Sequence, residues 1–125
     1  MQENKKILIV EDDKDFLWIL KQSFVSAGFF VVTAQDGQEG LMIAEKEKPD
    51  LIMLDILMPK IDGIETARKL QEARNKVPIV FLTNMKDEEH ISKAMEIVPN
   101  TEYIIKSDLT INEIVERIKI RLGLK

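Results

Sequence analysis

The stretch LIMLDILMPKIDG, residues 51–63, is the part of the sequence that says most about the fold. Its first four residues are apolar, and the run ends at a lone carboxylate, Asp55. A short apolar run is typical of a strand buried on both faces of a parallel sheet. Pro59 and the pair Asp62-Gly63 then indicate a loop that starts a helix. Because its neighbours are so apolar, Asp55 is better explained as a site residue at a strand end than as an ordinary turn residue.

Four other short runs have the same apolar and β-branched character, so the sequence predicts five strands. We expect their cores to be buried on both faces of the sheet. They cover residues 7–10, 29–34, 51–54, 77–83 and 102–106. Between the strands, apolar residues recur at helical spacing, and Thr110 with Glu113 forms a capping-box pattern at the start of the last predicted helix. Strands and helices in alternation predict a parallel sheet with helices on both faces.

The composition limits the class of protein. A chain of 125 residues suits one domain, which we place at residues 1–125. The net charge of −4 argues against direct binding of nucleic acid, since phosphate contacts need clustered Lys and Arg. The absence of cysteine excludes disulfides and thiolate metal sites. The sequence has neither a run long enough to span a membrane nor the pattern of a signal peptide, so we expect a cytoplasmic protein without a membrane partner.

Polar residues follow the predicted strands at the edge where an open parallel sheet binds ligands. They are Glu11, Asp12 and Asp13 after the first strand, Asp55 after the third, Thr83 after the fourth and Lys106 after the fifth. Crowded carboxylates without Cys or His suit Mg²⁺, which takes one or two carboxylates together with phosphate oxygens. A carboxylate beside Mg²⁺ can act as a nucleophile toward a phosphoryl group, while a lysine neutralises the phosphoryl oxygens.

Each of these residues also has an ordinary structural explanation. Asp13 is equally well explained as the N-cap of the next helix. A threonine that ends a strand is usually structural, and a single lysine is usually solvated. Thr83 and Lys106 therefore indicate a functional site only in combination with the acids. That combination favours a site for phosphoryl transfer.

The segments ILIVEDD, LIMLDILMPKIDG, PIVFLT and YIIK resemble the receiver domain of bacterial two-component response regulators, of the single-domain type. The resemblance extends from about Lys5 to Leu122. Its most specific part is the pattern Asp-x-x-Met-Pro-x-x-Asp-Gly, which runs from Asp55 to Gly63. The resemblance implies a flavodoxin-like (βα)5 fold, which is a doubly wound parallel sheet with strand order 2-1-3-4-5.

The resemblance also implies how the acids act. Asp55 would be the phosphoacceptor, taking a phosphoryl group from a histidine kinase or a histidine phosphotransfer protein. The cofactor would be Mg²⁺, bound by Asp55 and Asp12 directly, by Glu11 through water, and by the backbone carbonyl of Leu57. Such a domain catalyses only its own phosphorylation and slow dephosphorylation, so it is a signalling switch rather than an enzyme with turnover.

Three further residues resemble the parts of the family that respond to the phosphoryl group. Thr83 resembles the switch hydroxyl, Lys106 the lysine that pairs with the phosphoryl group, and Tyr103 the aromatic side chain that switches rotamer on the last strand. The implied output face consists of the fourth helix, the fifth strand and the fifth helix, and it would bind a downstream protein target. Trp18 on the first predicted helix could contact a kinase, but ordinary packing is the favoured explanation.

The chain departs from the family after the last strand. The family usually has Lys-Pro there, with a cis peptide bond, whereas Lys106 is followed by Ser107. A non-prolyl cis bond costs about 2.5–4 kcal/mol, so we expect a trans peptide and a rearranged loop over residues 106–109. This change puts the position of the lysine ammonium in question.

Other departures concern the lifetime of the phosphorylated state. Asn84 stands where the family mostly has a small residue, and it either narrows the entry to the site or turns to solvent. Leu57 and Met85 occupy the two positions that flank the path of the attacking water in the family. Neither side chain can orient water by hydrogen bonding. We therefore expect slow dephosphorylation.

Three other functions fit parts of the sequence. A Mg²⁺-dependent phosphatase usually has a second acid two positions after its nucleophile, where this chain has Leu57. A flavin-binding domain would need a phosphate-cradling loop after the first strand, where the acids of EDDKD, residues 11–15, would repel phosphate. A pseudo-receiver that binds partners without phosphorylation stays open as the alternative. Also open are the kinase, the signal, the target, the oligomeric state, a homodimer formed on phosphorylation, and whether the chain is one domain of a longer protein.

Overall fold

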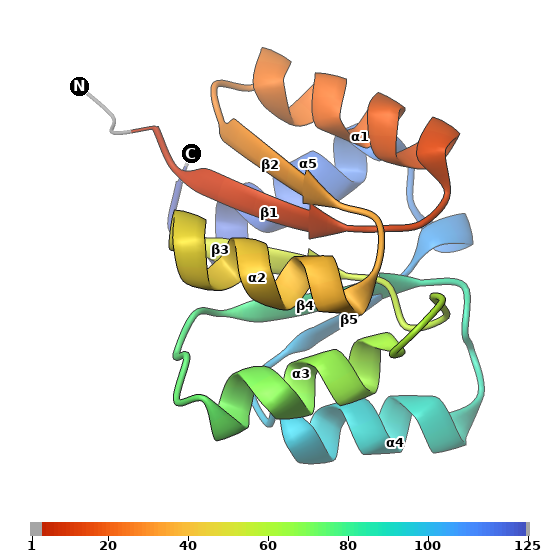
Figure 1. The fold of residues 1–125 in the computed structure, drawn as a ribbon. Coiled ribbons are helices and arrows are strands. Elements are labelled where there is room, and N and C mark those ends of the chain that lie inside the picture. Colours follow the sequence, from red (N-terminus) through yellow and green to blue (C-terminus); the bar gives the residue numbers. More distant parts are fainter. Residues whose placement is uncertain (1–3, 125) are drawn as a thin grey trace.

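Five strands form one parallel sheet in the computed structural model, which describes residues 4–124. The strands are β1 (Lys6–Val10), β2 (Phe30–Ala34), β3 (Leu51–Leu54), β4 (Ile79–Thr83) and β5 (Glu102–Ile105). Their order across the sheet is β2-β1-β3-β4-β5, and every pairing is parallel (Figure 1). The predicted flavodoxin-like doubly wound sheet of order 2-1-3-4-5 is therefore confirmed. Residues 1–3 and 125 of the predicted domain lie outside the described residues.

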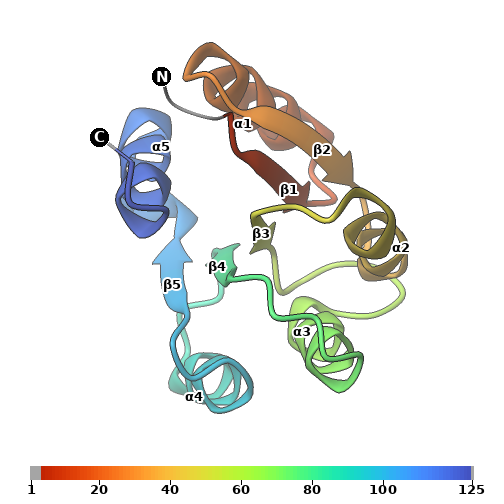
Figure 2. The same ribbon diagram turned by 90° about the vertical axis from the view of Figure 1, so that its left-hand side faces the viewer.

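Helices connect successive strands and cover both faces of the sheet. They are α1 (Lys14–Ser26), α2 (Gly37–Glu47), α3 (Gly63–Glu72), α4 (Glu88–Ile97) and α5 (Ile111–Arg121). Figure 2 shows α1 and α5 on one face and α2, α3 and α4 on the other, as alternating strands and helices predict. Within residues 4–124, no helix is long and apolar enough to cross a membrane.

Each of the five α-helices begins at a side chain that caps it. The capping residues, whose side chains accept hydrogen bonds from backbone N–H groups of the first turn, are Asp13, Asp36, Asp62, Asp87 and Thr110. A cap of this kind stabilises a helix by about 0.5–2 kcal/mol. The capping box predicted for Thr110 and Glu113 is present. The structural explanation of Asp13 is confirmed, since its Oδ1 accepts from the N–H groups of Asp15 and Phe16.

The core lies on both sides of the central strands. Every residue of β3 and β4 is buried, because each of these strands has a neighbour on both sides and helices above and below. The expectation that all five strands are buried on both faces is wrong for β2 and β5. Only Ala34 is buried in β2, where Phe30 is 56% exposed, and only Ile104 is buried in β5. These are the edge strands, which lack a neighbour on one side.

The packing of α1 leaves Trp18 at the surface. The helix packs through Leu17, Leu20 and Phe24, which are buried. Trp18 lies beside this stripe and is 63% exposed, so the packing of α1 covers only part of its side chain. A contact of Trp18 with a kinase stays a prediction.

Candidate functional site

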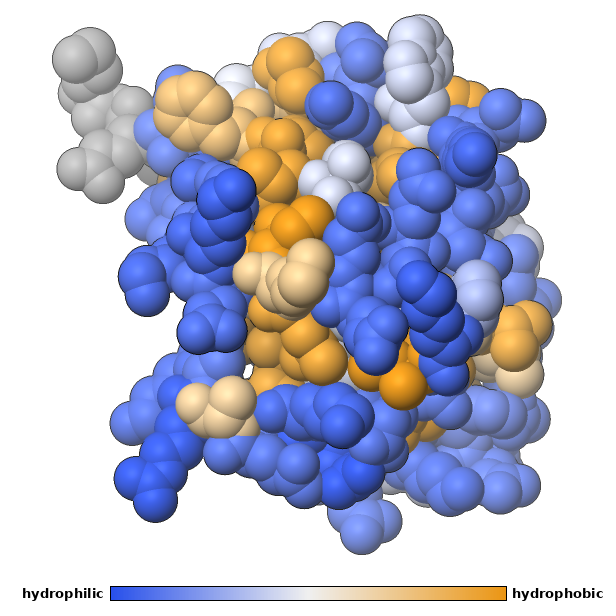
Figure 3. All heavy atoms as spheres, in the orientation of Figure 1, coloured by the Kyte–Doolittle hydropathy of each residue, from blue (hydrophilic) through white to orange (hydrophobic). Residues whose placement is uncertain are grey.

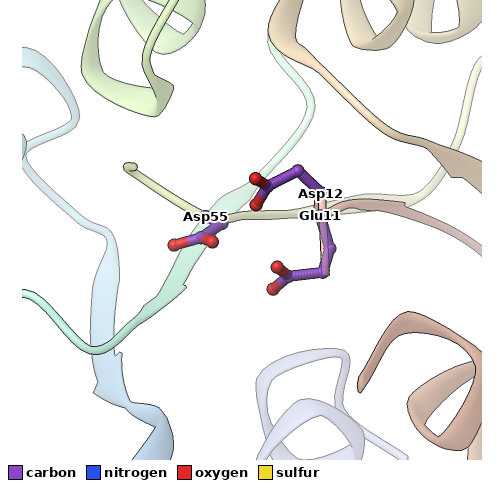
Figure 4. A group of neighbouring side chains, drawn as sticks. All are labelled: Glu11, Asp12 and Asp55. Carbon is purple, nitrogen blue, oxygen red and sulfur yellow. The ribbon is translucent and has the colours of Figure 1, made fainter. Parts of the chain in front are cut away.

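Three carboxylates meet beyond the ends of β1 and β3. The two strands are neighbours, with Val10 opposite Leu54, so the residues that follow them lie side by side. The N–H of Asp55 donates to the carbonyl of Val10 over 3.0 Å, which holds the two strand ends together. One carboxylate oxygen from each of Glu11, Asp12 and Asp55 lies within 4.8 Å of the others (Figure 4). The structure thus brings together the three acids predicted to bind a metal.

Two of these carboxylates are buried, and their burial changes the charge balance. Glu11 is 3% exposed and Asp55 is 6% exposed, whereas Asp12 is exposed. Burial raises the pKa of Glu11 to about 7; the hydrogen bond from Lys106 lowers this pKa, and the charge of Asp55 raises it further. The positive charge of Lys106 therefore balances the negative charges of the three carboxylates only in part. A set of oxygen ligands without sulfur or nitrogen suits a hard cation such as Mg²⁺, so the residues present fit the metal of the predicted site.

Lys106 reaches both buried acids from the end of β5. Its Nζ lies 2.6 Å from Oε1 of Glu11 and 3.2 Å from Oδ2 of Asp55. The ammonium also lies 4.8 Å from the centre of the Phe16 ring, within the range of a cation–π contact. Burial acts to lower the pKa of Lys106, but the hydrogen bond to Glu11 and the charges of Asp55 and Glu11 outweigh it and raise this pKa above its usual value. A charged ammonium group therefore lies between the two acids.

The loop after β5 differs from the family pattern without removing the lysine from the site. The peptide between Lys106 and Ser107 is trans, as expected, because residues 4–124 contain no cis peptide bond. A short 3₁₀ helix, η1 (Lys106–Asp108), follows β5, and Leu109 then returns to an extended backbone. The trans peptide is confirmed, whereas a rearrangement of residues 106–109 relative to the family stays a prediction.

Thr83 and Tyr103 are connected through one backbone segment. Thr83 ends β4 opposite Ile105 and is 1% exposed. Its hydroxyl oxygen accepts a hydrogen bond from the N–H of Met85 at 3.3 Å, and the Tyr103 hydroxyl donates to the carbonyl of Met85 at 2.6 Å. Burial raises the pKa of Tyr103 to about 12, with smaller contributions from the charges of Asp87 and Asp55. The phenol therefore stays a donor, and residue 85 lies between the two side chains.

The residues expected to control dephosphorylation lie at the rim of the site. Leu57 is 68% exposed, Asn84 is exposed and Met85 is half-buried. The exposure of Asn84 favours the explanation that its side chain turns to solvent.

The sequence did not show how two residues, Gly63 and Phe16, contribute to the site. A Cβ on Gly63 would lie 2.0 Å from the backbone oxygen of Asp55, so only glycine lets α3 begin this close to the end of β3. The Asp62-Gly63 pair predicted a loop that starts a helix, but not the close approach of that helix to the end of β3. Phe16 lies under the Lys106 ammonium, but in the sequence it looked like one more apolar residue of the first helix.

Comparison with known proteins points to one family. The family model of the response regulator receiver domain matches residues 7–119. The alkaline phosphatase synthesis transcriptional regulatory protein PhoP of Bacillus subtilis is 48% identical over 86 residues, which are 69% of this chain and 35% of that protein. The probable transcriptional regulator ycf27 of Guillardia theta is 35% identical over 106 residues, 85% of this chain and 41% of that protein. The chain thus spans less than half of the length of these relatives.

Solved structures agree with the family model. A response regulator receiver domain protein from Methanospirillum hungatei has a TM-score of 0.89 and 29% identity, covering 97% of this chain and 95% of that one. A two-component response regulator from Clostridium difficile has a TM-score of 0.88 and 28% identity, covering 96% of this chain and 97% of that one. Since the family model covers most of the sequence, and since the sheet order and the acidic cluster agree with it, the chain belongs to the receiver domain family of two-component response regulators.

Proposed function

We propose that residues 1–125 form a single receiver domain that acts as a phosphorylation switch, with Asp55 as the phosphoacceptor. The observation that carries the proposal is the contact of one lysine, Lys106, with the buried acids Glu11 and Asp55 at the end of the sheet. A buried nucleophilic carboxylate beside a fixed cation suits a reaction in which negative charge is transferred. The donor would be a histidine kinase or a histidine phosphotransfer protein, as for the family.

The transfer itself would need few groups. A carboxylate oxygen of Asp55 forms a bond to phosphorus, and the bond from phosphorus to the donor imidazole nitrogen breaks, leaving its electron pair on that nitrogen. Mg²⁺ would be held by Asp12, Asp55, the backbone carbonyl of Leu57 and, through water, Glu11, and when bound it would neutralise the phosphoryl oxygens. Lys106, 3.2 Å from Oδ2 of Asp55, would add a second positive charge.

The response would pass through Thr83 and Tyr103. The Thr83 hydroxyl oxygen accepts a hydrogen bond from the N–H of Met85, and the Tyr103 hydroxyl donates one to the carbonyl of the same residue. If Thr83 turns to the phosphoryl group, the Met85 segment is released and Tyr103 loses its acceptor. The output face, α4, β5 and α5, would change shape as a result and bind a downstream protein target.

The lifetime of the phosphorylated state would be long. Leu57 and Met85 carry no group that can orient an attacking water, and Asn84 faces solvent. Met85→Glu would add such a group, so the variant should lose the phosphoryl label faster than the parent protein. Equal decay rates would contradict this part of the proposal.

The proposed setting is the cytoplasm, with no membrane partner. In the longer relatives, which are named as transcriptional regulators, this region is one part of the protein, and we propose that the receiver part itself makes no contact with nucleic acid. Its net charge of −4 supports this, as phosphate contacts need a surplus of basic side chains. A homodimer formed on phosphorylation would be detected by measuring the mass in solution before and after modification.

An intact-mass measurement tests the central proposal. The protein is incubated with Mg²⁺ and acetyl phosphate, with Asp55→Asn as the control. A gain of one phosphoryl group that requires both Mg²⁺ and Asp55 is expected. If no group is added by acetyl phosphate or by a histidine phosphodonor, the alternative of a phosphorylation-independent pseudo-receiver, acting as a protein-interaction module, replaces the proposal.

A further inference from the structure

A groove opens at the end of the molecule opposite Asp55. It has a volume of about 940 Å³ and lies between the C-terminal halves of α2 and α3 and the loops that enter β3 and β4. Leu41, Ala44, Leu70 and Val77 provide its apolar lining. In the space-filling view, apolar surface lies between the hydrophilic ends of α2 and α3, toward the left of the picture (Figure 3). The volume is within the range of about 300–1,000 Å³ that is typical of ligand sites.

The rim of the groove is basic, although the chain as a whole is acidic. Lys48, Lys69, Arg74 and Lys76 line it, and all four are exposed. In the part of the chain that the structure describes, none of them takes part in an ion pair. We call this site, with its four cations and its apolar lining, the basic groove.

The acids of the basic groove do not balance these cations. Glu45 and Glu72 also line it. Glu72 accepts a hydrogen bond from Arg68 at 2.7 Å, so its charge is already paired. Four cations therefore face one carboxylate without an ion pair, in a protein whose net charge is −4. Such a local surplus attracts anionic groups.

Two of the cations stand where the backbone favours glycine. Lys48 is the C-cap of α2 with a φ of 47°, and Arg74, just after α3, has a φ of 59°. Helices commonly end in this left-handed conformation, but usually with Gly, because a Cβ is strained there. A basic side chain at both positions compensates the helix dipoles, and it also directs positive charge to the rim. Separating these two roles requires a matched control.

A second cavity shows what is particular to the basic groove. It has a volume of about 610 Å³ and lies between α1 and α5. Its only basic lining residue, Lys119, is paired with Glu116 at 3.3 Å. It therefore offers no free positive charge, and charge complementarity distinguishes the basic groove from an ordinary gap between helices.

We propose that the basic groove docks an acidic segment of a partner protein that also carries large apolar side chains. The apolar lining would bury those side chains, and the four cations would pair with the carboxylates around them. A free anion would use only the rim, and a nucleic acid would leave the apolar lining unused. Because the basic groove lies at the opposite edge of the sheet from Asp55, docking leaves the acceptor accessible and does not depend on phosphorylation.

The test uses the whole chain and a fluorescein-labelled peptide of alternating Asp and Leu. Binding is followed by fluorescence anisotropy at low and at high salt, and the site is located from amide chemical shifts. We expect binding that weakens with salt, and shifts concentrated in residues 44–49 and 69–77. A peptide with Ser in place of Leu should bind at least about tenfold more weakly, since it loses the apolar contacts.

Charge reversal locates the interaction. Lys69→Glu combined with Lys76→Glu should weaken binding by about tenfold or more, because two attractions become repulsions. The control is Lys46→Glu combined with Lys93→Glu. It changes the net charge equally and removes a basic residue from the last turn of α2, but neither residue lines the basic groove. Thermal melts of both double variants verify that they fold.

Several results would overturn the proposal. They are absence of binding to the Asp-Leu peptide, equal binding of the Ser peptide, equal loss in the two double variants, and shifts located elsewhere. Tighter binding of a labelled single-stranded oligonucleotide than of the peptide would assign the basic groove to nucleic acid instead. None of these results depends on whether Asp55 is phosphorylated.

Discussion

Charged side chains are arranged in opposite ways at the two ends of the parallel strands, which are the two edges of the sheet compared below. At the carboxyl ends of the strands, Glu11 and Asp55 are buried and contact Lys106. At the amino ends, the cations of the basic groove are exposed, and none of those described has a salt-bridge partner. Buried charged groups lose their hydration, which costs free energy, so an ion pair between them contributes little to stability. The buried acids and Lys106 are therefore better explained by the reaction proposed at Asp55. Exposed charges lose little, so they are available to a partner. If this contrast is correct, equivalent substitutions at the two edges should have very different effects.

The largest difference is expected between two glycines. Gly63→Ala places a Cβ 2.0 Å from the backbone oxygen of Asp55, so the start of α3 must move. We expect a loss of about 4 kcal/mol of unfolding free energy, typical of severe overpacking. Gly28→Ala, at the opposite edge, meets no atom within 4 Å but keeps a φ of 96°, and should cost about 1 kcal/mol. Urea unfolding of both variants makes the measurement, and similar losses would contradict the steric explanation.

The next comparison replaces one lysine at each edge. Lys106→Met leaves Glu11 and Asp55 buried without their cation, and we expect a loss of about 3 kcal/mol at pH 8 in the presence of a chelator. Lys69→Met removes an exposed lysine of the basic groove and should change stability by less than about 0.5 kcal/mol. If both substitutions cost the same, the ammonium of Lys106 contributes no more to stability than a surface lysine does.

The pH dependence of metal-free protein tests the burial of Glu11. Its folded pKa of about 7 lies above its ordinary value of 4.5, so the folded state binds more protons. The resulting stability is fully present below pH 4.5 and is lost as the pH rises through 7. We expect this loss to be about 2 kcal/mol between pH 5 and pH 8, and Glu11→Gln should remove it. A denaturation series in chelator measures it; an unchanged slope in Glu11→Gln would assign the pH dependence to another group.

Among the residues near Asp55, the smallest effect on stability is expected at Tyr103. Tyr103→Phe removes the donor to the carbonyl of Met85 and keeps the packing of the ring on Phe81. One hydrogen bond at a half-buried site contributes about 1 kcal/mol. Amide hydrogen exchange should also show faster opening of residues 84–87, whereas protection of β3 should stay unchanged. Unaltered exchange at residue 85 would mean that Tyr103 does not hold this segment.

Much of the fold follows from local features of the sequence. Apolar runs of four to seven residues mark the strands, and the spacing of apolar residues marks the helices. The capping box at Thr110 and Glu113 depends only on residues within one turn, and it is present as predicted. The position of Asp55 could also be predicted, because parallel strands end at the same edge of a sheet. Its proposed role rests on the resemblance to the family.

Other features depend on which elements become neighbours. The half-exposed β2 and β5 follow from strand order, and the exposed Trp18 follows from the way α1 packs. The contact of Lys106 with Glu11 joins residues from opposite ends of the chain, and no local pattern reports its geometry. The basic groove likewise collects cations from α3 and from the loops that follow α2 and α3, and each of them is an ordinary surface residue in the sequence. Local patterns specify the strands and helices because their hydrogen bonds and periodicity are short-range, whereas charge clusters arise only when distant segments pack together.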